Sequence, residues 1–277
     1  MPAQTSLPTI WHTPDDLWSR LAPVFGPDKP PGTVGRPAVP ARRIFDAIIF
    51  LLRTGCQWRA IPRETYAPGS TVHTRFRQWV AAGLFAQAWQ ILLEHYDLEL
   101  GIEWKWQALD GVITKAPLGG EATGPSPVDR GKSGTKRSVL TDAYGGPLSV
   151  VVTGANTNDK TVALATLDAV QAPRPEKVVC RLHRLCLDKG HDYEDVIAGV
   201  RERNYILHRS GLEGGLGTPR RLRRHPARRR VVERTHAWHH KFRRLLVRWE
   251  KKVTHYEAMI HLACVLILYR LVVTSYP

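Results

Sequence analysis

The segment from residue 228 to residue 252, RRRVVERTHAWHHKFRRLLVRWEKK, constrains the fold most strongly. Apolar and aromatic residues recur in it every three or four positions, which predicts one helix with a buried face and a basic face. A single acid, Glu233, lies among the cations of its first half. Glu233 could hold a divalent cation beside a polyanion, or it could pair with Arg229 or Arg230 on a solvated surface helix.

The positive charge of the chain is concentrated around this segment. The whole chain carries 40 Lys and Arg against 25 Asp and Glu, a net charge of +15. Residues 218–252 hold fourteen of these cations and two Glu, so twelve of the fifteen net charges lie there. Aromatic residues alternate with the cations, which favours a nucleic-acid-binding face over a merely solvated run of charge.

Cysteine usage and hydropathy exclude several other classes of protein. Four cysteines in 277 residues give no disulfide framework. The spacing Cys180-x-x-His183-x-x-Cys186 fits no standard zinc site, so packing in the core is the better interpretation. The apolar run at residues 262–273 is interrupted by Arg270 and is too short to span a bilayer, which predicts a buried core helix. We therefore expect a soluble cytoplasmic protein without a membrane segment.

The first 97 residues are expected to form a helical domain. Helices are predicted at residues 14–24, 41–53, 71–82 and 85–96, with Thr13 and Ser70 as N-caps and Gly55 as a C-cap. The second and third helices resemble a helix-turn-helix with a long turn, although a helical bundle without a DNA role has the same pattern. The candidate DNA contacts on the third helix are His73, Arg75 and Arg77. Arg36, in a Gly-Arg-Pro loop, suits either a minor-groove arm or a plain linker.

Residues 98–277 are expected to form a mixed α/β domain. Strands alternate with helices, and residues 137–141 and 147–153 flank a turn at Asp142, which predicts a hairpin. Residues 121–136 are rich in Gly, Ser and Pro and suggest a flexible basic loop carrying Lys132 and Lys136 beside Arg137. The pattern predicts a sheet with helices packed on it.

Two acids follow apolar strands in similar ways. Asp110 and Asp188 each come directly after a predicted strand, and each is followed within two residues by Gly. A turn would explain either one alone, but ligands also collect at strand ends. If the two strands are neighbours, Glu233 could complete a three-carboxylate site of the hard oxygen type that selects Mg²⁺ or Mn²⁺. Glu213 and Glu250 are alternative candidates for the third carboxylate of this site.

Several motifs occur in the order found in one family. They include LLRTGCQWRAIP at residues 51–62, DRGKSGTKRSVLTDAYGGPL at 129–148, LCLDKGHDYEDV at 185–196 and RRRVVERTHAWHHKFRRLLVRWEK at 228–251. With these motifs the chain resembles the DDE transposases of bacterial insertion sequences, in the IS-four/IS-five-like group with a YREK-type third motif. The resemblance implies an RNase-H-like mixed sheet flanked by helices, preceded by an all-α, helix-turn-helix-like N-terminal domain.

The resemblance also implies the site. Motif by motif, the metal-binding triad falls on Asp110, Asp188 and Glu233, and the arginine of the third motif falls on Arg229. The sequence departs from the family pattern at Pro226, His240 and His191. These departures leave the triad unchanged, but the auxiliary contacts expected at these three positions do not carry over.

The function expected is a transposase that binds the inverted repeats of its element on double-stranded DNA. It would cut and join DNA with two Mg²⁺ or Mn²⁺ ions and act as a homodimer or higher assembly. A hydrolytic RNase-H-like nuclease and a catalytically decayed helix-turn-helix DNA-binding protein are the alternatives. Further candidate DNA contacts in the catalytic domain are Arg229, Arg230, Lys241, Arg243, Arg244, Lys132, Lys136 and Arg137.

Overall fold

The computed structural model describes residues 9–26, 34, 38–173, 183–187, 193–209 and 230–275. The chain forms two compact units, a helical unit of residues 1–100 with 239–277, and a sheet unit of residues 101–238. The first boundary lies close to the expected one at residue 97. The second differs from the expected division, because residues 239–277 group with the N-terminal helices and not with the sheet.

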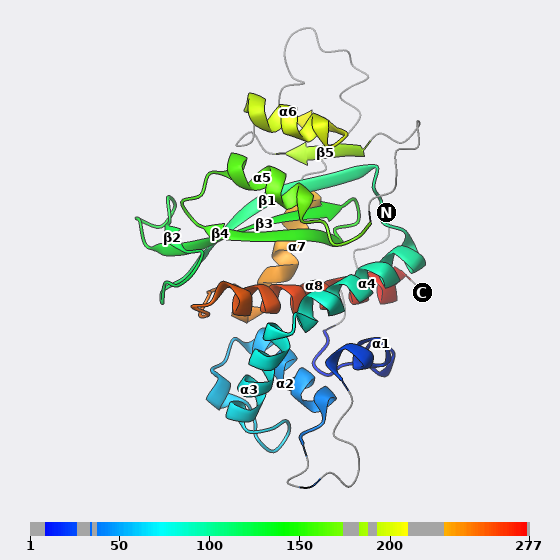
Figure 1. Cartoon of the computed structure of the whole chain (residues 1–277), viewed down its shortest axis with the longest axis vertical. Helices are drawn as coiled ribbons and strands as arrows, with labels where there is room; N and C mark the ends of the chain where they lie inside the picture. Colours follow the sequence, from blue (N-terminus) through cyan, green and yellow to red (C-terminus); the bar gives the residue numbers. More distant parts are fainter. Residues whose placement is uncertain are drawn as a thin grey trace. The chain divides into compact units, whose positions relative to one another are not determined.

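The helical unit is built around a cluster of aromatic rings. Phe25 lies 4.9 Å from Phe45 and 4.6 Å from Trp79 between ring centroids, and Phe85 contacts the same group. These residues come from four helices, so the cluster ties the N-terminal helices together. The elements of the unit, shown in Figure 1, are α1 (Asp15–Phe25), α2 (Ala41–Thr54), η1 (Trp58–Ala60), α3 (Gly69–Ala81), α4 (Leu84–Leu100), η4 (Arg243–Leu245) and α8 (Val253–Ser275).

Helix α8 is the central apolar element of the helical unit. By length and composition alone it could cross a membrane, but 78% of its apolar window is buried inside the structure. It packs along α4 and has little polar face of its own. A helix that is apolar all round needs neighbours on every side, which explains why it joins the N-terminal helices. The expectation of a core helix is confirmed.

The predicted helix ends are correct in one case and wrong in two. Gly55 ends α2 in the left-handed conformation (φ 68°), and its N–H donates to the Leu51 carbonyl at 2.8 Å, as predicted. Thr13 does not cap α1: the N-cap position is Pro14, and the Thr13 hydroxyl and N–H both donate to Asp46 Oδ1. Helix α3 begins at Gly69, so Ser70 lies inside the helix and is not its cap.

The sheet unit contains a mixed sheet in the order β4–β3–β1–β5–β6, with β2 also paired to β3. Strand β1 runs antiparallel to β3 and parallel to β5. The expected α/β class with a mixed sheet flanked by helices is confirmed. The elements are β1 (Trp106–Lys115), β2 (Gly124–Pro125), β3 (Ser133–Asp142), β4 (Pro147–Gly154), α5 (Asp159–Asp168), β5 (His183–Leu187), α6 (Glu194–Glu202), β6 (Tyr205–Arg209) and α7 (Arg230–His240).

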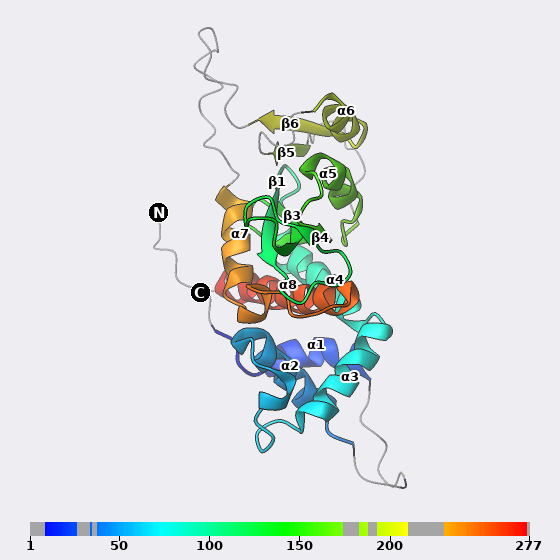
Figure 2. The ribbon, with the colours of Figure 1, turned by 90° about the vertical axis from the view of Figure 1, so that its left-hand side faces the viewer.

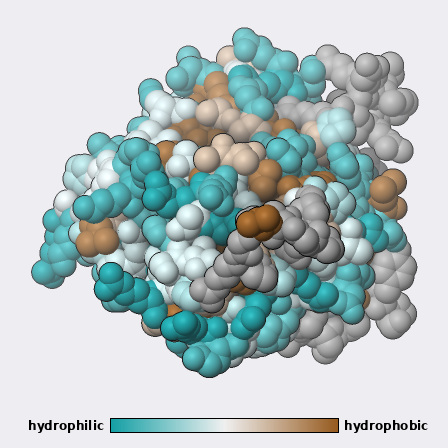
Figure 3. All heavy atoms as spheres, turned by 60° about the horizontal axis from the view of Figure 1, so that its bottom comes forward, coloured by the Kyte–Doolittle hydropathy of each residue, from teal (hydrophilic) through white to brown (hydrophobic). Residues whose placement is uncertain are grey.

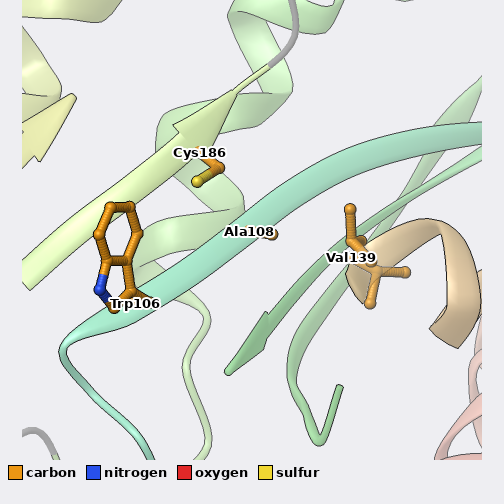
Figure 4. Close-up of a cluster of buried hydrophobic side chains, with 5 residues drawn as sticks. Trp106, Ala108, Val139 and Cys186 are labelled. Carbon is orange, nitrogen blue, oxygen red and sulfur yellow. The ribbon is translucent and has the colours of Figure 1, made fainter. Parts of the chain in front are cut away.

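Helices cover both faces of the sheet. Figure 2 shows α7 on one side of β1 and β3, with α5 on the other side. The Thr166 hydroxyl of α5 donates to Ser138 Oγ of β3 at 2.9 Å, on the second of these faces. On the first face, one apolar cluster joins α7 to three strands. Its members are Trp106, Ala108, Val139, Cys186 and Val232, and Figure 4 labels the four that come from the strands.

The single helix predicted at residues 228–252 is not observed. Helix α7 ends at His240, and a short 3-10 turn at Arg243–Leu245 follows. Phe242 breaks the helix, because its backbone is extended (φ −90°, ψ 100°) and its side chain is fully buried. Tertiary burial of Phe242 has therefore overridden a helical pattern that is correct for the first half of the segment.

A half-buried histidine of α8 makes the stability of the chain dependent on pH. His261 of α8 lies 5.1 Å from the Trp89 ring, and burial lowers its pKa from 6.5 to about 4. The folded state therefore binds this proton less readily than the unfolded state does. Its contribution to stability is complete above pH 6.5 and is lost as the pH falls towards 4.

We expect His261→Phe to remove this dependence while keeping a ring against Trp89. Between pH 7 and pH 4.5 the wild type should lose about 2 kcal/mol more unfolding free energy than the variant. Urea unfolding of the full chain, followed by far-ultraviolet circular dichroism, measures both proteins. Equal losses in the two would contradict the role assigned to His261.

Candidate active site

Asp110 lies in the middle of β1, on the face of the sheet that α7 covers. Side chains alternate along a strand, so Asp110 shares its face with Trp106 and Ala108. Its cross-strand partner on β3 is Val139, which belongs to the same apolar cluster. Asp110 is half-buried, and its Oδ1 accepts a hydrogen bond from the Gly111 N–H at 2.9 Å. Strand β1 continues past Asp110 to Lys115, so Asp110 lies within the strand and not after it.

Glu233 lies in the first turn of α7, directly after Val232 of the apolar cluster. Val232 is fully buried and Glu233 is exposed, so the helix is anchored on one side and presents the acid on another. Val139, the cross-strand partner of Asp110, belongs to the same cluster as Val232. The structure therefore brings the helix of the third predicted acid to the sheet face that carries the first.

Two hydrogen bonds hold α7 on the turn between β3 and β4. The buried Thr235 hydroxyl donates to the Gly145 carbonyl at 2.8 Å, and Arg234 donates to the Tyr144 carbonyl at 2.7 Å. The helix approaches Gly145 closely, since a Cβ on this glycine would lie 3.0 Å from Thr235 Oγ1. Sequence reasoning did not identify Thr235 or Arg234 as positioning residues, because only the fold brings them to the turn.

Asp142 organises this same turn. Its carboxylate is fully buried and accepts hydrogen bonds from the N–H groups of Tyr144 at 3.0 Å and Gly146 at 2.8 Å. It also accepts a longer bond, 3.4 Å, from the Glu103 N–H. The prediction that Asp142 belongs to a hairpin turn is confirmed, and its oxygens are committed to the backbone.

The second predicted acid, Asp188, lies outside the described residues, as do Arg229, Arg36, Glu213, Pro226 and His191. The described part of β5 ends at Leu187 and runs parallel to β1, with Cys186 opposite Ala108. Within the described residues, no three His, Cys, Asp or Glu side chains form a group that could hold a metal ion. Asp110 and Glu233 supply the hard oxygen donors that Mg²⁺ and Mn²⁺ prefer. Glu250, one of the two acids that compete with Glu233, is buried and accepts a hydrogen bond from Arg244 Nε at 2.7 Å.

Three of the cations predicted to contact DNA are buried in the structure. Lys136 lies in β3 and not in a flexible loop, because the strand already begins at Ser133, and Arg137 follows it in the same strand. Lys136 Nζ donates to Asp159 at 2.6 Å, and Arg137 is fully buried. Arg244 donates to Glu250 and to a backbone carbonyl. None of the three presents its charge at the surface, which corrects the expectation for these residues.

The other described candidates are accessible. Lys132, Arg230, Lys241 and Arg243 are exposed, and so is Arg77 on α3. Arg75 is half-buried, with its guanidinium 5.9 Å from the Trp79 ring. His73 is half-buried against Trp58, and burial, followed by the charges of Arg77 and Arg244, lowers its pKa.

Family models match most of the chain. The family model described as "Transposase DDE domain" matches residues 107–268, and one described as "Putative transposase of IS4/5 family" matches residues 14–89. The chain therefore belongs to the DDE transposase family, a class of enzymes that cut DNA and transfer its strands. Enzymes of this family use divalent metal ions. The matched range 107–268 crosses from the sheet unit into the helical unit.

Curated relatives point to insertion sequences. The chain is 36% identical over 160 residues to a "Putative transposase for insertion sequence element IS402" of Burkholderia cepacia, covering 56% of this chain and 72% of the relative. It is 32% identical over 116 residues to a second protein of the same element, an "uncharacterized 16.2 kDa protein", covering 41% of this chain and 79% of the relative. We conclude that the chain is a transposase of the insertion-sequence type.

Solved structures with some similarity include Mos1 transposase complexes. The paired-end complex with the left transposon end has a TM-score of 0.29 at 12% identity, covering 79% of this chain and 81% of that one. The Mos1 paired-end complex with Mn has a TM-score of 0.28 at 13% identity, covering 88% and 81%. Scores this low add nothing to the fold described above.

The bond from Thr235 to the Gly145 carbonyl predicts a measurable effect. Thr235→Val keeps the shape of the side chain but leaves a buried carbonyl without this donor, so we expect a loss of about 1–2 kcal/mol of unfolding free energy. Thr235→Ser keeps the hydroxyl and should lose less. Urea unfolding of the full chain measures both. A Thr235→Val protein as stable as the wild type would show that the bond does not hold α7.

Proposed function

We propose that Asp110, Asp188 and Glu233 form the catalytic triad with which this transposase cuts the ends of its element and joins them to target DNA. The observation that carries the proposal is the position of α7. Val232 anchors this helix on the sheet face of Asp110, so the first and third acids of the family pattern approach the same region. The YREK-type character of the third motif stays a prediction.

The described strands support the inclusion of Asp188. Ala108 lies opposite Cys186 in the parallel pairing of β1 and β5. Asp110 and Asp188 each come two residues later in the sequence. Equal spacing on parallel neighbouring strands is the arrangement that brings two side chains to one level of a sheet. Strand β1, which carries Asp110, and strand β5, whose described part ends one residue before Asp188, are neighbours, which supports the proposal.

Two Mg²⁺ or Mn²⁺ ions bound by these carboxylates would supply the positive charge that activates the attacking oxygen and stabilises the leaving oxygen of a phosphodiester. The carboxylates of Asp110, Asp188 and Glu233 would hold such ions as hard oxygen donors. Gly111 orients the Asp110 carboxylate through its N–H. The α7 helix fixes the position of Glu233 through Thr235.

The exposed cations of the sheet unit would hold the DNA backbone around this site. Lys132 and Arg230 are exposed there, and Arg229 occupies the family's arginine position next to Arg230. Phosphate contacts of this kind position the strand without reading its sequence. We assign recognition of the element ends to residues 1–97, with α3 as the helix that enters the groove and Arg77 as its exposed cation.

The partner is double-stranded DNA, both as element end and as target. An element has two ends that must be brought together, so we propose a homodimer or a higher assembly on DNA. The basic composition and the burial of α8 fit a protein that works in the bacterial cytoplasm on the nucleoid.

Removing the charge of one triad member should separate binding from chemistry. Asp110→Asn, Asp188→Asn and Glu233→Gln should each bind element ends like the wild type. Each should lose about 1000-fold in strand transfer in Mg²⁺, which corresponds to several kcal/mol of transition-state stabilisation. Asp195→Asn, on an exposed acid of α6, is the matched control. A triad variant that joins DNA at the wild-type rate removes that residue from the site.

A pre-cut element end distinguishes a transposase from a hydrolytic nuclease of the same fold. Given a duplex with a free 3′-OH at the element end, the wild type in Mg²⁺ should join it to a target plasmid. A nuclease would release shortened strands and form no joined product. Gel analysis of labelled ends measures both outcomes, and end binding without either reaction would indicate a catalytically inactive DNA-binding protein.

A further inference from the structure

A groove in the helical unit combines residues from two distant parts of the chain. It has a volume of about 430 Å³ and lies between the C-terminal half of α3 and the beginning of α8. Six of its eight lining residues have polar or charged side chains, and the other two are small and apolar. The polar lining residues are Thr74, Arg77, Gln78, Lys252, Thr254 and His255. Both walls belong to the same compact unit.

The groove is cationic. Arg77 and Lys252 are exposed, and neither forms an ion pair with an acid of the described residues. The lining contains no Asp or Glu. Glu250, the acid nearest in sequence, is buried in its ion pair with Arg244. Two uncompensated cations in one open groove create a local field that attracts a polyanion.

The pKa of His255 is affected by both cations. Its pKa is lowered first by burial, then by Lys252, His73 and Arg77, while Glu250 acts in the opposite direction. The ring is therefore neutral at pH 7, and it can donate a hydrogen bond without adding charge. A residue of α3 and a residue before α8 thus influence one side chain in the groove, as the shared lining requires.

The lining chemistry decides between possible occupants. An apolar peptide would need a continuous hydrophobic floor, whereas this groove offers hydroxyls, an amide and two cations. Hydrophilic residues also predominate on the face of the molecule drawn in Figure 3, where hydrophobic residues occur in smaller groups. Arginine, lysine, threonine and glutamine are the side chains that contact the phosphates of DNA.

We propose that this groove holds a stretch of DNA phosphodiester backbone, clamped between Arg77 on α3 and Lys252 before α8. Thr74, Gln78 and Thr254 donate hydrogen bonds to the phosphate oxygens. The inference rests on the proposed function for the identity of the polyanion. It adds that the C-terminal segment beginning at Lys252 is part of the DNA-binding surface, so residues 1–97 do not form that surface alone.

Salt dependence of binding tests the clamp with matched controls. Lys252→Gln and Arg77→Gln each remove a lining cation, while Lys251→Gln and Arg63→Gln remove exposed cations that do not line the groove. The probes are a duplex copied from the end of the element and a scrambled duplex of the same length. Fluorescence anisotropy over a range of salt concentrations measures the affinity of the full-length chain for each.

Each lining variant should bind both duplexes several-fold more weakly and lower the slope of log K against log salt by about 0.9, the value for one phosphate contact. The two control variants should keep the wild-type slope. Lys252→Arg should restore it, because the charge returns, and circular dichroism should show the same folded structure in all variants.

The outcomes separate the two proposals. If the wild type binds and joins element ends but the lining variants match their controls, the clamp is wrong and the proposed function stands. A slope change on the element duplex alone would mean base reading rather than a backbone contact, which also overturns the clamp. If the wild type neither binds duplex DNA nor joins ends, the proposed function itself fails.

Discussion

The packing of α7 on the sheet is the interaction on which the site depends. Val232 enters the apolar cluster of β1, β3 and β5, and Thr235 bonds to the Gly145 carbonyl. Without these contacts Glu233 would lie on a helix with no defined relation to Asp110. Hydrophobic burial sets the face that the helix covers, and the hydrogen bonds set its position along that face. An exposed acid is thus positioned by its buried neighbours.

Charge in the basic segment has two different uses, which composition alone does not separate. Arg248 is fully buried, with Nε donating to the Glu250 carbonyl at 2.9 Å, and Arg244 bonds to the Glu250 side chain. These arginines stabilise the junction before α8. The exposed cations Arg230 and Lys241 keep their charge at the surface. A buried cation contributes little to steering a polyanion, so the local excess of positive charge overstates the DNA-binding face.

Local patterns in the sequence predicted those features that depend on local chemistry. The Gly55 cap and the hairpin at Asp142 follow from turn preferences, and both are observed. The end of the predicted basic helix was missed because Phe242 is buried by residues far away in the chain. Lys136 was predicted in a loop because its glycine- and serine-rich neighbours conceal the start of β3. The triad came from family motifs, and no local pattern joins its three acids.

The position of α8 explains why the groove could not be read from the sequence. Nothing in the segment beginning at Lys252 resembles a DNA-binding motif, and its partner Arg77 lies on α3 in the N-terminal part of the chain. The two meet because α8 is apolar over most of its length and must be surrounded, which draws it against the N-terminal helices. Hydrophobic burial of α8 thus places Lys252 opposite Arg77, and the polar groove is a consequence of apolar packing.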